Sequence, residues 1–369
     1  MRGGRRGRRS AARCGCVVWA WLITEILSGC SSLPAAREMG DMALLRTMGV
    51  DSAPAGVAVT GSTGPRAKGL QTEGEPSLVL TAEKPSLSGA CLAMQGQSDS
   101  YVFFGYVDQL LVGEELARSG VQPVLDYFAQ DVELGLGAQL WLVRGATARE
   151  AVSSGGEEGA DSRLETLQND SKMGIAAISR TAGEVYTDLL ELGAAFVPAL
   201  TPAGDEIAVL YENGYGVLKG DTLAGFMDGE AARGLELLAG GSAADILEAE
   251  GTEASVKIIS SHTTSGLDFR NGALAALKIN CRVEARLAEY RRPLNSGELE
   301  RLQREIEDRE RARLEEALEQ LRAWGADCTG LGAKAAMSHP GQWQGIRADW
   351  PEWFAKTPVK IQVQVRIRE

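Results

Sequence analysis

The clearest chemistry in this sequence belongs to a cysteine, Cys30, that is preceded by Leu27, Ser28 and Gly29. Small residues before a cysteine leave the backbone open to a signal peptidase, and the thiol is the group that can receive a diacylglycerol. Two acyl chains hold a protein stably on a membrane, whereas one chain binds reversibly. The pattern therefore predicts cleavage between Gly29 and Cys30 and a lipid anchor on Cys30.

The residues before Cys30 have the three parts of an export signal. Six arginines lie within residues 1–13, an apolar run follows at residues 17–27, and Ser28-Gly29-Cys30 ends the segment. A helix over this run would rise about 16 Å, half of a bilayer core, so it suits a spanning helix poorly. The arrangement resembles a bacterial lipobox, and we predict that residues 1–29 are a lipoprotein signal peptide. The alternatives are an ordinary cleaved signal, a buried cysteine and twin-arginine export.

The charge of the chain is uneven. The whole sequence has a net charge of −12, and residues 1–29 carry six arginines and one glutamate, so the remainder has a net charge of −17. Such an excess of acidic residues repels phosphate backbones and anionic lipid headgroups. The net charge thus favours neither nucleic-acid binding nor electrostatic docking on a membrane, and a lipid would have to hold the chain there.

Catalytic and metal-binding patterns are scarce in the sequence. The two histidines, His262 and His339, are far apart, and no Cys-x-x-Cys pair follows the predicted signal. Nucleophile-elbow and phosphate-loop patterns are missing too. The acidic pairs Glu114-Glu115 and Glu157-Glu158 could act as acid and base, but a solvated surface explains them better. We therefore expect no metal, no cofactor and no enzymatic activity, and favour a protein that binds or assembles.

Two further groups of residues have structural explanations. Three cysteines, Cys91, Cys281 and Cys328, remain once those of the signal peptide and the anchor are set aside. An odd number is a poor disulfide framework, so we expect these cysteines to be small buried hydrophobic residues and expect no disulfide. Four aromatic residues near the C-terminus could form a ligand cage, although packing of a short helical segment on a sheet is favoured: Trp343, Trp350, Trp353 and Phe354.

The first two thirds of the chain alternate between helical and strand patterns. Residues 30–202 are predicted to form an N-terminal α/β region, with a strand at 139–143 and a helix that ends at Gly193. Residues 203–250 are predicted to form a β-meander followed by a helix. Its turns are expected at Glu212-Asn213-Gly214 and Lys219-Gly220-Asp221.

Residues 251–369 have the most regular pattern. Apolar and polar residues alternate over 277–287 and 359–367, which predicts two strands with one face in solvent. Between them, residues 298–323 place apolar side chains on one helical stripe. A coiled-coil partner surface is an alternative for the charged side of this helix. We predict a C-terminal α+β domain, an antiparallel sheet with this long helix packed on it. The fold class expected for the chain is α+β, with three subdomains of mixed or antiparallel sheet and flanking helices.

Several segments resemble, in order and spacing, the Ger(x)C family, the lipoprotein C subunits of the nutrient germinant receptors of endospore-forming bacteria. The segments that carry the resemblance are the lipobox, Arg37-Glu38, Gly49-Val50-Asp51, Leu111-Val112-Gly113-Glu114-Glu115-Leu116-Ala117, Gly120-Val121, Val124-Leu125-Asp126-Tyr127-Phe128 with Asp131, Gly216-Val217-Leu218-Lys219-Gly220-Asp221-Thr222-Leu223-Ala224-Gly225 with Glu230 and Arg233-Gly234, and Gly325-Ala326-Asp327-Cys328-Thr329-Gly330-Leu331-Gly332 with Pro340, Trp343, Trp350 and Phe354. The sequence departs from the family pattern at Ser31-Ser32, at Tyr106-Val107 and in the loops at 61–76 and 153–175.

The resemblance implies a monomeric three-domain lipoprotein on the outer face of the inner spore membrane. It implies membrane-embedded A and B subunits as partners, and neither an enzymatic activity nor a cofactor. A solute-binding lipoprotein of a transporter is the main alternative, and it would have two doubly wound lobes with a cleft. A surface lipoprotein enzyme is a further alternative, weakened by the missing catalytic patterns.

Overall fold

The computed structural model describes residues 42–64, 77–156, 159–204, 208–241, 245–248, 254–290 and 292–368. Within these residues the strands form an eight-stranded, a four-stranded and a two-stranded sheet. The predicted signal peptide and Leu27, Ser28, Gly29 and Cys30 lie outside the described residues. No helix among the described residues is long and apolar enough to cross a membrane.

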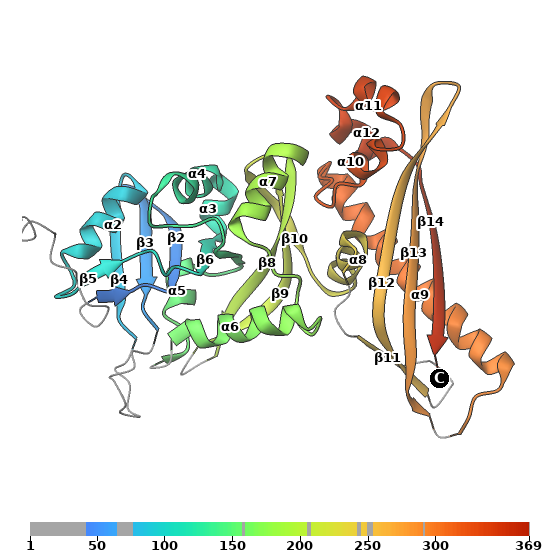
Figure 1. Cartoon of the computed structure of the whole chain (residues 1–369), viewed down its shortest axis with the longest axis horizontal. Coiled ribbons are helices and arrows are strands. Elements are labelled where there is room, and N and C mark those ends of the chain that lie inside the picture. Colours follow the sequence, from blue (N-terminus) through green and yellow to red (C-terminus); the bar gives the residue numbers. More distant parts are fainter. Residues whose placement is uncertain are drawn as a thin grey trace, which may run out of the picture. The chain divides into compact units, whose positions relative to one another are not determined.

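The eight-stranded sheet has the order β10-β9-β8-β7-β6-β2-β3-β4 (Figure 1). Its strands are β2 (Thr47–Ala53), β3 (Gly56–Ser62), β4 (Val79–Lys84), β6 (Gln109–Gly113), β7 (Gln139–Val143), β8 (Ala194–Ala203), β9 (Val209–Lys219) and β10 (Thr222–Met227). The pairs within β2-β6-β7-β8 are parallel, and the outer pairs are antiparallel. β1 (Met42–Leu44) and β5 (Tyr101–Phe103) form the two-stranded sheet.

Helices cover both faces of the eight-stranded sheet, which explains why β6 and β7 are buried along their whole length. One face packs against α2 (Leu87–Gln95), α3 (Glu114–Ser119), α4 (Gln122–Gln130) and α7 (Ala182–Leu192). The other face packs against α5 (Ala148–Val152) and α6 (Gly159–Lys172). Leu110 and Leu111 illustrate the alternation, because they belong to the cores on opposite faces.

The predicted turn at Glu212-Asn213-Gly214 is wrong, because β9 runs through it as one strand with an irregularity in its pairing to β8. Gly214 has φ +70°, and a Cβ there would lie 1.9 Å from the carbonyl oxygen of Met227. Glycine thus allows close approach of the end of β10, a role distinct from a hairpin turn. The second predicted turn is confirmed, since Lys219 pairs with Thr222 across Gly220 and Asp221. The expected helix follows as α8 (Gly229–Ala239).

The four-stranded sheet has the order β11-β12-β13-β14, with strands β11 (Ile246–Glu248), β12 (Ala254–Arg270), β13 (Ala273–Tyr290) and β14 (Val359–Arg368). The first two pairs are antiparallel, but β13 and β14 are parallel. The expectation of a wholly antiparallel sheet is therefore wrong for this pair. The long helix between them returns the chain to the end where β13 begins, as a parallel crossover requires.

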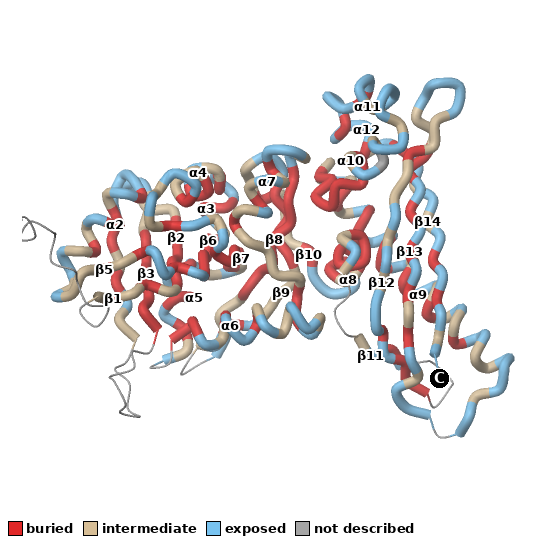
Figure 2. Tube along the Cα trace, in the orientation of Figure 1, coloured by how far each residue is buried: buried red, intermediate tan, exposed pale blue. Residues whose placement is uncertain are grey.

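The crossover consists of α9 (Ser296–Trp324), α10 (Leu331–Ala336), α11 (Pro340–Ile346) and α12 (Trp350–Lys356). Ile279 and Val283 of β13 and Val363 and Val365 of β14 are buried in one core with the apolar stripe of α9. Figure 2 shows the alternation of buried and exposed residues along these strands. The predicted α+β class, with a long helix packed on the last sheet, is confirmed.

The core under α9 also includes residues of the eight-stranded sheet. Phe196, Tyr215 and Met227 belong to the same cluster as Ile279 and Leu314. Members of the three described cores lie between Ala43 and Val365, within one compact unit that begins at Ala43. The predicted boundaries at 202/203 and 250/251 stay predictions. The eight-stranded and four-stranded sheets are mixed and unlike the two doubly wound lobes of a solute-binding lipoprotein.

Candidate functional site

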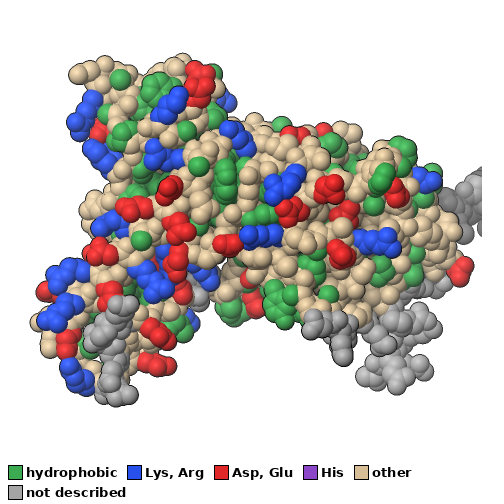
Figure 3. All heavy atoms as spheres, turned by 180° about the vertical axis from the view of Figure 1, so that it is seen from behind, with side chains coloured by type: hydrophobic (Ala, Val, Ile, Leu, Met, Phe, Trp, Pro, Cys, Tyr) green, Lys and Arg blue, Asp and Glu red, His purple; other side chains and the backbone are tan. Residues whose placement is uncertain are grey.

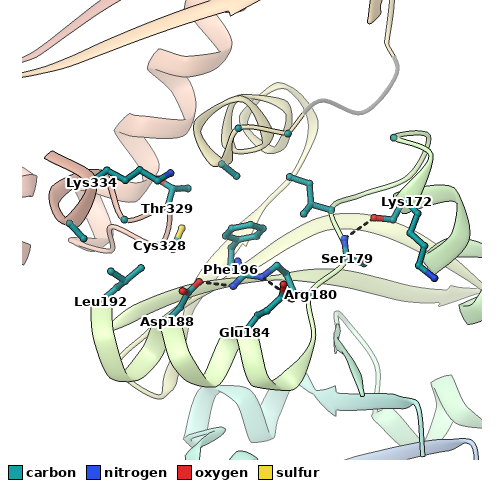
Figure 4. A pocket seen from close by; sticks show the side chains of 18 of the residues that line it. Lys172, Ser179, Arg180, Glu184, Asp188, Leu192, Phe196, Cys328, Thr329 and Lys334 are labelled. Carbon is teal, nitrogen blue, oxygen red and sulfur yellow. Dashed lines mark hydrogen bonds and ion pairs between the residues drawn. The ribbon is translucent and has the colours of Figure 1, made fainter. Parts of the chain in front are cut away.

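A groove of about 740 Å³ is bordered by α7, β8, the end of α8 and the loop before α10 (Figure 4). Arg180, which precedes the N-cap Thr181 of α7, lies with its guanidinium 4.5 Å from the ring centroid of Phe196 in β8. Its Nη2 is 2.6 Å from Asp188 Oδ2, and its Nε is 3.8 Å from Glu184 Oε2. These contacts hold Arg180 between two acidic residues of α7 and an aromatic ring of the sheet, so they connect α7 with β8 on this side of the groove.

Lys172 and Lys334 flank the groove in Figure 4. Lys172 Nζ is 3.4 Å from Asn169 Oδ1, a contact that leaves its charge in solvent. Burial raises the pKa of the Cys328 thiol, so this cysteine stays protonated and unreactive. The groove is therefore lined by both polar and apolar side chains, and its one thiol is not activated.

Asp327, in the loop before α10, organises the C-terminal helices. Its carboxylate accepts hydrogen bonds from the backbone N–H groups of Leu331 (2.8 Å) and Gly332 (2.7 Å), and from Trp350 Nε1 (2.9 Å). Burial raises the pKa of Asp327, and these three donors act in the opposite direction. Gly332 lets the indole approach, since a Cβ there would be 2.3 Å from Trp350 Cε2.

The aromatic residues pack on one another. The ring centroid of Trp350 lies 5.1 Å from that of Trp343 and 5.9 Å from that of Phe354. Trp350 and Phe354 are buried in the core beneath α9, and Trp353 is exposed. The packing interpretation is therefore confirmed for Trp350 and Phe354. The cysteine interpretation is confirmed as well, because Cys91, Cys281 and Cys328 are free and buried.

The structure does not bring the other candidate residues together. His262 is exposed on β12, and His339 is the N-cap residue of α11, 5.4 Å from the ring centroid of Phe269. Glu114 pairs with Arg118 (2.7 Å) and accepts a hydrogen bond from the Gly145 backbone N–H (2.9 Å). Glu115 is exposed. Glu157 and Glu158 lie outside the described residues. In the described part of the chain, no group of three histidine, cysteine or acidic residues could hold a metal ion.

The sequence pattern does not predict a group of buried charged residues around Arg313. Arg313 of α9 is 5% exposed and contacts Glu310 (2.8 Å), Asp245 (2.8 Å) and Glu230. Burial opposes its charge, but these carboxylates raise the pKa of Arg313. Glu310 and Arg313 fill the gap in the apolar stripe of α9 between Ile306 and Leu314. That gap is the sequence signal that could have identified them.

Several residues of the segments that resemble the family lie where two elements pack against each other. Asp51, at the end of Gly49-Val50-Asp51, accepts hydrogen bonds from the backbone N–H groups of Ala148 (2.7 Å) and Arg149 (2.9 Å) at the start of α5. A Cβ on Gly225 would lie 2.5 Å from Trp324 Cζ2 of α9. These positions need a small residue or a buried carboxylate for packing.

The fold defines a mixed α+β protein whose last sheet is covered on one face by a long helix. Residues 35–202 match the family described as "Spore germination protein N-terminal domain", and residues 213–369 match "Spore germination B3/ GerAC like, C-terminal". The chain belongs to the Ger(x)C family of spore germination proteins, as the resemblance predicted.

The solved structure of the GerBC protein has the same fold. It superposes with a TM-score of 0.61 at 19% identity, over 87% of this chain and 97% of that one. At this identity the likeness shows the fold alone. No curated protein matches the chain.

Proposed function

We propose that this chain is the C subunit of a spore nutrient germinant receptor, required for the germination response and without catalytic activity. The observation that carries the proposal is the match of both family descriptions, in order, over residues 35–202 and 213–369. The fold shared with the GerBC protein agrees with it. The buried joints at Asp51, Asp327 and Arg313 suit a rigid subunit that presents surfaces to partners.

The proposed partners are the membrane-embedded A and B subunits of the receptor, on the outer face of the inner spore membrane. A lipid on Cys30 would confine the chain to the plane in which these partners lie. Confinement raises the effective concentration of each partner, so weak contacts suffice for assembly. The affinity of the unlipidated chain for its partners in solution is then expected to be low.

Deleting the gene tests the function. Spores are expected to form normally but to fail to germinate with the nutrient that this receptor recognises. Germination forced by a route that bypasses receptors should persist. Normal nutrient germination of the deletion strain, in a genome without a second receptor of the same specificity, would contradict the proposal and favour the solute-binding lipoprotein.

Labelling with a fatty acid tests the anchor. The wild-type chain should take up the label, and Cys30→Ala should not. Cys16→Ala is the matched control, because this cysteine precedes the predicted cleavage site and should leave labelling unchanged. If Cys30→Ala keeps the label and still fractionates with membranes, the anchor lies elsewhere.

A further inference from the structure

The solvent-facing side of the four-stranded sheet is basic. The registers of β12, β13 and β14 place outward residues in five rows across the strands. From one end these rows are Gly266-Lys278-Lys360, Thr264-Asn280-Gln362, His262-Arg282-Gln364, Ser260-Glu284-Arg366 and Lys257-Arg286-Arg368. We call these five rows the basic face.

The seven lysines and arginines of the basic face are all exposed, and Glu284 is the one acidic residue within its rows. Glu284 is paired with Arg368 at 2.6 Å. Acidic residues lie at both ends, since Lys278 contacts Asp268 (3.3 Å), and Glu248 and Glu289 occupy the row beyond Arg286. The basic face is therefore a bounded patch of positive charge on a chain of strongly negative net charge.

This sorting is a property of the sheet. On the side of the molecule seen in Figure 3, acidic and basic side chains are interspersed. The opposite face of the same sheet packs on α9 through Ile279, Val363 and Val365. No described element packs on the basic face, so its side chains extend into solvent.

The extent of the basic face suits a broad anionic surface. Five rows of a sheet extend about 27 Å, and its strands are about 4.8 Å apart, so the cations lie side by side on one face of the sheet. A hollow of about 200 Å³ in the middle is lined by His262, Arg282 and Gln364, among others. Such a hollow can admit the phosphate of one headgroup.

An apolar residue accompanies the cations at one end of the basic face. Ile246 of β11 pairs with Lys257, lies in the row of Arg286 and Arg368, and is 61% exposed. Cationic side chains around an exposed aliphatic residue are typical of proteins that bind membrane interfaces. A bilayer interface would use both the charges and this exposed side chain.

We propose that the basic face docks on the surface of a bilayer that contains anionic phospholipids. The proposal goes beyond the proposed function but rests on it in one respect, because a lipid-anchored chain is already close to such a surface. Docking would orient the C-terminal sheet against the headgroups. Acyl chains alone would leave the domain free to rotate.

Co-sedimentation with vesicles tests the docking. The chain from Ser31 to Glu369 contains all described cores and neither the N-terminal arginines nor the lipid. It should bind vesicles of phosphatidylcholine with 30% phosphatidylglycerol and ignore pure phosphatidylcholine. Binding should weaken between 50 and 300 mM NaCl, because exposed charges are screened.

The decisive variant replaces Arg282, Arg286 and Lys360 by glutamine. Loss of three cations is expected to lower the partition coefficient about 100-fold. The matched control carries Arg301→Gln, Arg304→Gln and Lys356→Gln, which change the net charge equally on exposed parts of α9 and α12. The control should bind like the unsubstituted chain, and both triple variants should keep its thermal midpoint.

Three outcomes would overturn the docking proposal. They are no binding to the anionic vesicles at 50 mM NaCl, an equal loss in the control variant, and binding to soluble polyglutamate without binding to vesicles. Since the tested chain carries no lipid, failure here leaves the Cys30 anchor and the receptor function untouched. Loss of the fatty-acid label, in turn, would not affect this result.

Discussion

Arg313 is a buried cation whose guanidinium contacts three carboxylates from α8, α9 and the residue before β11. Arg313→Met would leave Glu310 buried without its partner. Burial already raises the pKa of Glu310, so its unpaired carboxylate would be costly to keep in the core. We expect a loss of about 3–5 kcal/mol in the free energy of unfolding, measured with urea. The control Arg309→Met removes a half-exposed contact to Glu230 and should cost less than about 1 kcal/mol.

A second variant separates the lost ion pair from a lost side chain. Arg313→Met combined with Glu310→Leu removes both buried charges and should recover a large part of the stability. If the double variant is as unstable as Arg313→Met alone, the cost comes from packing, and the explanation by an unpaired charge is wrong.

Asp327 is expected to hold the aromatic cluster. Asp327→Ala removes acceptors for two backbone N–H groups and for the Trp350 indole. We therefore expect the free energy of unfolding to fall by about 2–3 kcal/mol and the tryptophan fluorescence to shift. Asp349→Ala is the control, since Asp349 is exposed and makes no side-chain cap hydrogen bond to α12. Unchanged fluorescence in Asp327→Ala would contradict the role of this carboxylate.

At the residue scale, the sequence predicts roles that depend on local pattern and misses those that depend on distant partners. The buried cysteines and the packed aromatic residues follow from hydrophobicity alone. The partners of Arg313 include Glu230, which is 83 residues away, and those of Asp51 are 97 and 98 residues away. No local spacing marks such pairs, so the charged joints become visible only in the fold.

Among the elements, β14 offers a direct test of orientation. Val363 is buried against α9, and the next residue, Gln364, is exposed on the basic face. Val363→Asp places an unpaired carboxylate in the core and should destabilise the protein by at least about 3 kcal/mol. Gln364→Asp, with the same final side chain one residue later, should change stability by less than about 0.5 kcal/mol. Similar losses in both variants would reject the assigned faces.

The start of α9 gives a prediction in pH. Glu298 forms a capping box with Asn295 and contacts Arg292 Nη2 at 2.5 Å, and the arginine together with the Asn295 N–H lowers the pKa of Glu298 to about 2. Because this value lies below the unfolded value of 4.5, the ionised carboxylate stabilises the fold above pH 4.5. This contribution is lost as the pH falls through 2.

The variant Glu298→Gln isolates that contribution. The difference in thermal midpoint between wild type and Glu298→Gln should be largest near pH 6 and should shrink toward pH 2. Glu300→Gln, on an exposed position of the same helix, is the control and should show no comparable trend. A constant difference for Glu298→Gln across this range would argue against an ionised cap.

At the element scale, the period of the sequence predicts the type and the buried face of the last strands and of α9. It does not predict their pairing. The direction in which β14 pairs with β13 depends on the end of the sheet to which the 68 residues between Tyr290 and Val359 return the chain. That return point is set by how the helices of the crossover pack on the sheet. The Asn213-Gly214 step has the composition of a turn, but contact with the end of β10 makes it part of a strand.

For the whole molecule, net charge proves a poor guide to surfaces. The sequence alone shows that Lys278, Arg282 and Arg286 share one side of a strand. Only the parallel register adds Lys360, Arg366 and Arg368 beside them. A chain of net charge −12 can therefore carry a basic face, because the sheet collects cations from segments far apart in the sequence.

The whole molecule is also expected to behave as one cooperative unit across the gap between the two family matches. That gap, residues 203–212, includes the end of β8 and the start of β9, which pair along most of their length. The ring centroids of Phe196 and Tyr215, from the two sides of the gap, lie 5.6 Å apart in the core that also holds Ile279 and Leu314.

A protease site inserted between residues 204 and 208 should therefore give two fragments that co-elute as one species. Their thermal midpoint should fall, because the covalent link that limits the entropy of separation is gone. Phe196→Ala should weaken the cleaved pair further, by removing a large buried side chain from the shared core, whereas Leu190→Ala on an exposed position of α7 should not. Fragments that separate on gel filtration under native conditions would contradict the shared core and favour domains that fold independently.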